Sequence, residues 1–108
     1  MQHFSLADVL TRQQGAGKPY LEFLREASLS VGLYMLPAGG VDGQKPHTED
    51  EVYYIVSGRG QIQVADESRP VEAGSVVFVA ASVEHRFHSI TENLHILVFF
   101  APAEGSQA

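Results

Sequence analysis

The chain has 108 residues, of which 44% are apolar and 19% charged, and this composition predicts one ordinary globular domain over residues 1–108. A net charge of −6 with 7 scattered Lys and Arg residues argues against nucleic acid as a partner. The absence of Cys excludes disulfides and thiolate metal sites.

A short helix is the first predicted element. Ser5 is a suitable N-cap for a helix that includes Leu6, Val9 and Leu10, and the polar, glycine-containing residues 13–17 end it. Residues 1–17 are therefore expected to form an N-terminal segment beside the β structure. This segment lacks the basic and apolar regions of a signal peptide, and no apolar stretch approaches the roughly 20 residues that span a bilayer. We expect a cytoplasmic protein without a membrane partner.

The rest of the chain has the pattern of an all-β protein. Short runs of alternating or continuous apolar residues, separated by turn residues, predict strands. The predicted strands are residues 20–25, 29–36, 52–57, 60–65, 75–79, 84–90 and 94–100. Many short strands at this spacing favour a sandwich or a barrel, and residues 102–108 are expected to form a loose tail.

Two stretches carry His next to acidic residues. The first contains His47, Glu49 and Glu51 at the entrance of a predicted strand, and the second contains His85. Neutral imidazole with carboxylate is a ligand set for a first-row divalent metal. Residues two apart on a strand share a face, so His47, Glu49, Glu51 and Tyr53 point one way if the strand is regular. The alternative is a polar loop at a strand entrance.

Both stretches lie within motifs that resemble those of the cupins, a family of small β-barrels. Gly39, Lys45, His47, Glu51 and Gly58 have the spacing of the first cupin motif, with Lys45 in the position of its first His. The second motif is matched by Gly74 and His85, while its Pro, Gly and Asn positions hold Ala80, Ser82 and Ser89. Fifteen residues separate the two motifs, as in single-domain microbial cupins.

The resemblance implies a cupin-type double-stranded β-helix, that is, a jelly-roll barrel, with a short N-terminal helix. It also implies that His47, Glu51 and His85 bind a divalent metal ion, either iron, manganese, nickel, zinc or copper. Because a protonated Lys cannot bind a metal, Lys45 leaves a set of two His and one carboxylate with open positions, similar to the facial triad of iron enzymes. A second alignment takes His47 as the first His and brings Glu49 near the missing second one.

The other candidate residues concern the pocket. Tyr53 and Phe87 are expected to line it, and Lys45 is either an exposed loop residue or attracts a substrate carboxylate. No catalytic residue is identified, although Tyr53 and Glu49 are candidates for proton transfer. Glu49 is otherwise expected to be solvated.

Three functions are compatible with the sequence. One is a metal-dependent enzyme of the dioxygenase or isomerase type that acts on a small organic molecule. The others are a non-catalytic module that binds a metal or small ligand, and a structural barrel without metal. The resemblance and the need to protect edge strands also predict a homodimer.

Overall fold

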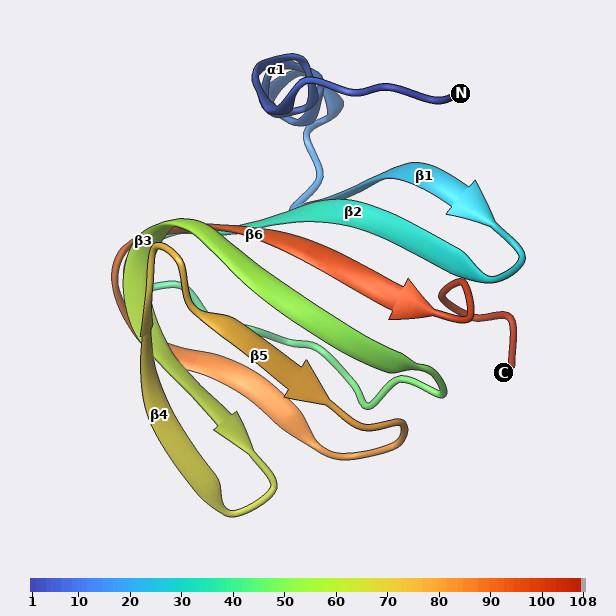
Figure 1. Cartoon of the computed structure of the whole chain (residues 1–108). Helices are drawn as coiled ribbons and strands as arrows, with labels where there is room; N and C mark the ends of the chain where they lie inside the picture. The colour runs from blue at the N-terminus through green and yellow to red at the C-terminus, as the bar shows by residue number, and fades with distance from the viewer. Residues whose placement is uncertain (108) are drawn as a thin grey trace.

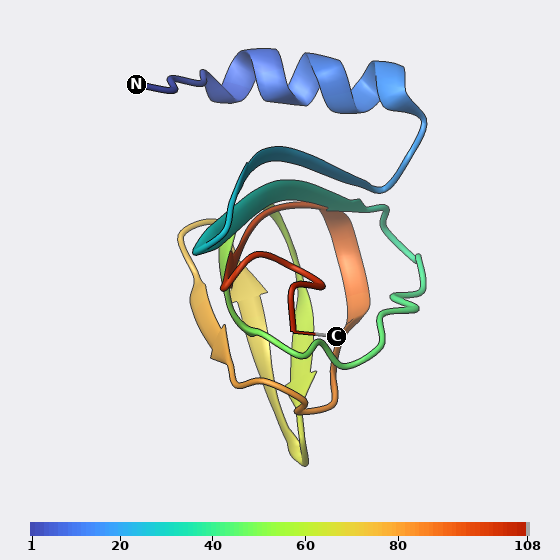
Figure 2. The ribbon, with the colours of Figure 1, turned by 90° about the vertical axis from the view of Figure 1, so that its right-hand side faces the viewer.

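The computed structural model describes residues 1–107, and within them one helix is followed by a six-stranded antiparallel sheet. The sheet folds over into two facing halves of a jelly-roll barrel, with the helix lying across one side (Figures 1 and 2). The elements are α1 Leu6–Ala16, β1 Tyr20–Glu26, β2 Leu29–Leu36, β3 Asp50–Val64, β4 Glu67–Glu72, β5 Val76–Val79 and β6 His85–Ala101. The predicted jelly-roll barrel with a short N-terminal helix is thereby confirmed.

The helix has the predicted caps. Ser5 Oγ accepts a hydrogen bond from the amide of Asp8, and Gly17 ends the helix with a φ of 66°. The helix packs on β1 and β2, where the side-chain amide of Gln13 donates to the carbonyls of Pro19 and Leu33. Among residues 1–107, no helix is long and apolar enough to cross a membrane.

Two long strands, β3 and β6, organise the barrel. They pair along their whole length, from Asp50↔Ala101 to Val64↔His85, and complete the order β1-β2-β6-β3-β4. Register shifts between Ile55 and Gln61 bend this ribbon in the middle. The ends of the ribbon therefore curve toward each other across the barrel interior, as Figure 1 shows.

The sequence-based prediction divided each of these strands in two. The predicted strands end at residues 57 and 90 and begin again at 60 and 94, but both breaks lie inside continuous strands. Gly58 has a φ of 98° and packs against the backbone of Asn93, so the glycine allows a bulge and a close approach between strands instead of a hairpin.

The strand β4 was missed altogether. It pairs with residues 59–64 of β3, but its residues are exposed except for Val71, and it includes Pro70. A polar strand at the sheet edge has no alternating apolar pattern that a sequence could reveal.

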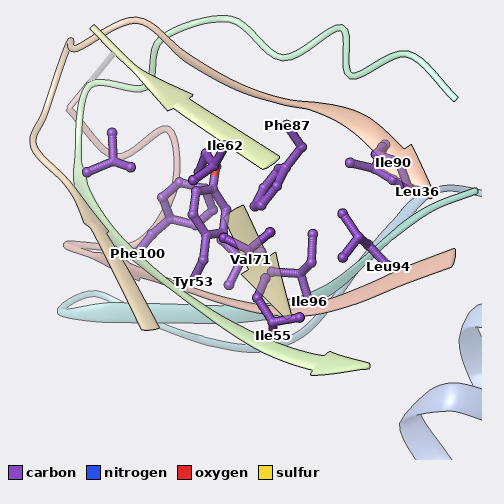
Figure 3. Packing of buried hydrophobic residues seen from close by; sticks show 12 residues of the cluster. Leu36, Tyr53, Ile55, Ile62, Val71, Phe87, Ile90, Leu94, Ile96 and Phe100 are labelled. Atoms are coloured by element: carbon purple, nitrogen blue, oxygen red, sulfur yellow. The ribbon is translucent and has the colours of Figure 1, made fainter. Parts of the chain in front are cut away.

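The core fills the space between the two halves of the bent ribbon. Alternate residues of β3 and β6 point inward, and Figure 3 shows their side chains packed together. The buried cluster comprises Leu36, Tyr53, Ile55, Ile62, Val71, Val79, Phe87, Ile90, Leu94, Ile96, Val98 and Phe100.

The C-terminal tail is not loose over residues 102–107. Ala103 is buried, and the amide of Glu104 donates to Ser30 Oγ at 2.9 Å. Further along, the amides of Gly105 and Gln107 donate to the carboxylate of Glu49. The tail therefore crosses the open end of the barrel, as seen in Figure 2. Position 108 lies outside the described residues.

Candidate metal centre

Glu51 and His85 meet inside the barrel although they lie at opposite ends of the β3–β6 ribbon. Glu51 pairs with Phe100 near the end of β6, whereas His85 begins β6 and pairs with Val64. The bend in the ribbon brings His85 Nε2 to 2.8 Å from Glu51 Oε1, and each side chain is 1% exposed. The two functional groups are therefore removed from water.

The short distance between His85 Nε2 and Glu51 Oε1 is not a hydrogen bond when the His85 ring is neutral. His85 Nδ1 lies 2.9 Å from the carbonyl oxygen of Val83, and because a carbonyl only accepts, Nδ1 carries the proton of the neutral ring. In that tautomer Nε2 presents a lone pair toward a carboxylate. Neither Nε2 nor the two oxygens of Glu51 has a hydrogen-bond partner among the described residues. Buried acceptors arranged in this way need a proton or a cation between them.

These surroundings change the pKa of the His85 ring. Burial opposes the charged imidazolium, but the Glu51 carboxylate and the Val83 carbonyl outweigh it and raise the pKa of His85 above its usual value. Without a metal, Glu51 therefore favours the protonated form of His85, in which Nε2 would donate to the carboxylate.

His47 completes the group from the loop that precedes β3. Its ring packs edge-on against Phe100 at 4.8 Å and lies 5.6 Å from the His85 ring, measured between centroids. The carbonyl of His47 accepts from the amide of Ser82 at 2.6 Å, which ties this loop to the loop between β5 and β6. One ligand atom from each of His47, Glu51 and His85 lies within 4.8 Å of the others.

The donor set fits a first-row divalent metal. Two atoms bound to one ion at about 2.1 Å are at most about 4.2 Å apart, so the three side chains need only small rotations to reach a common ion. Two imidazoles and one carboxylate suit iron, manganese, nickel, zinc and copper. The contact of His85 Nδ1 with Val83 is the outer hydrogen bond that a metal-binding imidazole commonly makes.

A buried carboxylate that the sequence-based prediction overlooked supports this site. Asp42 lies between the predicted strands 29–36 and 52–57, yet its side chain is buried. It accepts hydrogen bonds from the Tyr34 hydroxyl, the amide of Phe87, and both the main-chain and side-chain amides of Gln44. Since a carboxylate only accepts, the side-chain nitrogen of Gln44 faces Asp42 and its oxygen faces the site.

Gln44 Oε1 in turn contacts two predicted site residues. It accepts from the Tyr53 hydroxyl at 3.2 Å and lies 3.2 Å from His47 Nε2. Tyr53 is fully buried, and burial together with the charge of Glu51 raises the pKa of its hydroxyl. Tyr53 is therefore a neutral hydrogen-bond donor beside the candidate metal ligands. Phe87 packs edge-on against Tyr53 at 5.0 Å within the core. Both were expected to line the pocket, but neither lines the small cavity that adjoins His47.

Two predicted residues lie elsewhere. Lys45 is exposed and does not line the cavity beside His47, so the structure gives no support to its role in attracting a substrate carboxylate. Glu49 was expected to be solvated, but it is 2% exposed, since the tail covers it. Despite the opposing effect of burial, hydrogen bonds from Thr48 and the amides of Gly105 and Gln107 lower the pKa of Glu49. Glu49 therefore holds the tail, and its oxygens are engaged there.

A small cavity of about 140 Å³ adjoins His47. Its other lining residues are Tyr20, Tyr34, Gln44, Val98, Phe100 and Glu104. Glu104 Oε2 lies 3.4 Å from His47 Nδ1, and burial raises the pKa of this carboxyl group. Tyr20 and Glu104 come from the two ends of the barrel chain, and nothing in their local sequence indicates that they would meet at His47.

Comparisons with known proteins agree with the fold. The family model of the cupin domain matches residues 32–100. The uncharacterized protein SCO3923 of Streptomyces coelicolor is 50% identical over 96% of this chain and 99% of its own length. Among solved structures, KdgF from Halomonas sp. has a TM-score of 0.73 with 16% identity, covering 82% of both chains. TT1209 from Thermus thermophilus has a TM-score of 0.72 with 21% identity, covering 95% of this chain and 99% of that one.

Proposed function

The chain belongs to the cupin family, and we propose that it binds one divalent first-row metal through His47, Glu51 and His85. The observation that carries the proposal is the buried pair of His85 Nε2 and Glu51 Oε1, 2.8 Å apart without a hydrogen bond. Such a pair is costly without a bound cation or proton, and His47 supplies a third ligand atom within reach.

We further propose that the metal serves a reaction on a small organic molecule, of the dioxygenase or isomerase type. A bound metal with open positions polarises ligand oxygens, and iron adds redox chemistry with dioxygen. The protein would contribute a small cavity beside His47, a neutral Tyr53 hydroxyl held by Gln44, and a tail that covers the barrel end.

Metal analysis of variants tests the ligand assignment. Purified protein is loaded with zinc, nickel, manganese, copper or, without oxygen, ferrous iron, and bound metal is measured per chain. We expect about one ion per chain in the wild type, and loss of metal in His47→Ala, Glu51→Gln and His85→Ala. His88→Ala is the matched control, because His88 lies on the same strand with its ring bonded to Ser68. Full metal content in a folded His85→Ala variant would refute the assignment.

Turnover separates the enzyme from a non-catalytic binding module. With ferrous iron, dioxygen consumption in the presence of candidate small molecules is measured against the Glu51→Gln variant. Consumption that depends on both the metal and Glu51 supports the enzyme, whereas ligand binding without any conversion supports the module.

A homodimer is part of the same proposal. The outer face of the paired strands β3 and β5 exposes Tyr54, Val76 and Phe78, an apolar surface that a second copy would cover. Sedimentation of the wild type and of a Val76→Lys/Phe78→Lys variant tests it, and a monomeric wild type at micromolar concentration would contradict it.

A further inference from the structure

The cavity beside His47 contains a hydroxyl group that has no partner. Tyr20 and Tyr34 face each other across β1 and β2, with ring centroids 6.2 Å apart, and both line the cavity. The Tyr34 hydroxyl donates to Asp42 at 2.8 Å. The Tyr20 hydroxyl is buried and makes no hydrogen bond with any described residue. A buried hydroxyl without a partner is unfavourable, and at the wall of a cavity its natural partner is a ligand.

The fold makes room for this hydroxyl. A Cβ atom at Gly32 would lie 2.2 Å from both Cζ and Oη of Tyr20, so the phenol head occupies the space that any other residue at position 32 would fill. Gly32 is not among the glycines with positive φ, so the glycine is needed here to leave room for the Tyr20 ring and not to adopt an unusual backbone conformation. The position of the Tyr20 hydroxyl is thus determined by β2.

The charges around the cavity limit what it can accept. No Lys or Arg is among the lining residues, while Glu104 contributes a carboxyl group. Apart from the metal ion proposed at His47, an anionic ligand would meet no positive charge of a Lys or Arg there and would face Glu104. Burial, followed by the nearby carboxylates of Glu104 and Glu22, also raises the pKa of Tyr20, which keeps its hydroxyl a donor.

We propose that this cavity binds a small uncharged organic molecule whose carbonyl or hydroxyl oxygen accepts a hydrogen bond from Tyr20. At about 140 Å³ the cavity is well below the roughly 300–1,000 Å³ of pockets for drug-sized ligands, so the molecule has only a few heavy atoms. This inference rests on the proposed function in that the ligand lies beside His47, and it names the class of substrate.

The test compares two probes of equal size and different charge. Hydroxyacetone is neutral, and glycolate replaces its methyl group by an anionic oxygen. Binding is followed by NMR titration of the isotopically labelled protein, with zinc and without metal. We expect hydroxyacetone to shift the amides of Val98 and Phe100, and Tyr20→Phe to weaken its binding about tenfold, the factor for loss of one hydrogen bond.

Matched variants control for general effects. Tyr54→Phe makes the same change at a tyrosine that lies outside the cavity, on the outer face of β3, and should leave hydroxyacetone binding unchanged. Glu104→Gln should raise the affinity of glycolate relative to hydroxyacetone at least fivefold, whereas Glu92→Gln, at an exposed carboxylate, should not. Because each comparison is between a variant and the wild type, the intrinsic preference of zinc for glycolate cancels.

The outcomes separate this inference from the metal assignment. If zinc does not bind, the proposed function fails, and the titration of the metal-free protein still decides the ligand class. The inference is overturned if Tyr20→Phe binds hydroxyacetone as well as the wild type does, or if hydroxyacetone leaves the cavity amides unshifted. A glycolate preference that Glu104→Gln does not alter overturns the charge argument.

Discussion

At the proposed site, the buried pair of His85 and Glu51 would make a metal ion compete with a proton. In the metal-free protein Glu51 raises the pKa of His85, whose Nε2 faces the carboxylate at 2.8 Å. A metal ion needs that same nitrogen unprotonated. Raising the pH should therefore strengthen metal binding, and replacing Glu51 by Gln should remove this dependence.

The size of the effect follows from the proton balance. While His85 is protonated in the metal-free protein, release of its one proton should raise the apparent zinc affinity about tenfold per pH unit, or about 1.4 kcal/mol. The stability of the metal-free protein should show the opposite trend. A raised pKa means that the stabilisation by the His85–Glu51 pair is complete below about pH 6.5 and is lost as the pH rises through the raised pKa. Zinc at a hundredfold excess over its Kd should restore about 2.7 kcal/mol, which corresponds to a Tm increase of roughly 10 °C.

Three measurements test this reasoning. NMR titration of the metal-free protein gives the pKa of His85 directly, and calorimetry in two buffers counts the protons released by zinc between pH 6 and 7.5. In Glu51→Gln burial becomes the main influence on His85, so its pKa should fall below the usual value, and zinc affinity should fall more than about a hundredfold. The reasoning is refuted if metal-free His85 stays neutral throughout this range, or if zinc releases no proton.

Three further predictions concern the scaffold and are checked by urea denaturation. Gly58→Ala should lower the free energy of unfolding by about 3–4 kcal/mol, because φ is 98° and the new Cβ would lie 2.1 Å from the Asn93 carbonyl oxygen. Gly60→Ala, at a glycine without positive φ, should lower it by less than about 1 kcal/mol, and equal losses would contradict this explanation. Glu49→Ala should lower the free energy of unfolding by about 2–3 kcal/mol and expose the amides of residues 105 and 107 to hydrogen exchange. In the wild type, the stabilisation by Glu49 should disappear as the pH falls through its lowered pKa. Unchanged exchange in the variant would show that other contacts hold the tail. Ser82→Gly should stabilise the protein by up to about 1 kcal/mol, because Ser82 has a φ of 66°, and a loss of stability would indicate that its side chain is needed.

The three expected ligands could be selected from the sequence because each lies at a fixed distance from a glycine of a cupin motif. Strand parity alone does not orient all of these side chains, however. β3 begins at Asp50, so His47 and Glu49 lie in a loop where alternation does not hold. Glu51 and Tyr53 do alternate inward on β3, whereas Glu49 turns toward the tail. Local periodicity predicts direction only where the residues are in a strand.

The supporting residues could not be predicted because their contacts join distant parts of the chain. Asp42 contacts Phe87 across 45 positions, and the Glu49 carboxylate holds Gly105 across 56. Tyr20 depends on a glycine in the next strand, and Glu104, which lines the same cavity, lies in the tail. Each of these residues in isolation has the sequence context of an ordinary turn, strand edge or terminus, and only the closure of the barrel gives it a role.

The departures from the cupin motifs are therefore of two kinds. Ser82 and Ser89 stand where the second motif has Gly and Asn, and both have left-handed backbone, with φ of 66° and 50°. Gly and Asn are the residues that adopt this conformation most readily, so these motif positions specify the backbone around His85 and not the chemistry of the site. Lys45 is different, because it stands in a ligand position and is exposed. On this side of the site the groups nearest to His47 are Gln44 and Glu104, which are neutral and acidic. Lys45 therefore takes the place of a motif His without adding a positive charge to the cavity, which is consistent with the uncharged ligand that we propose.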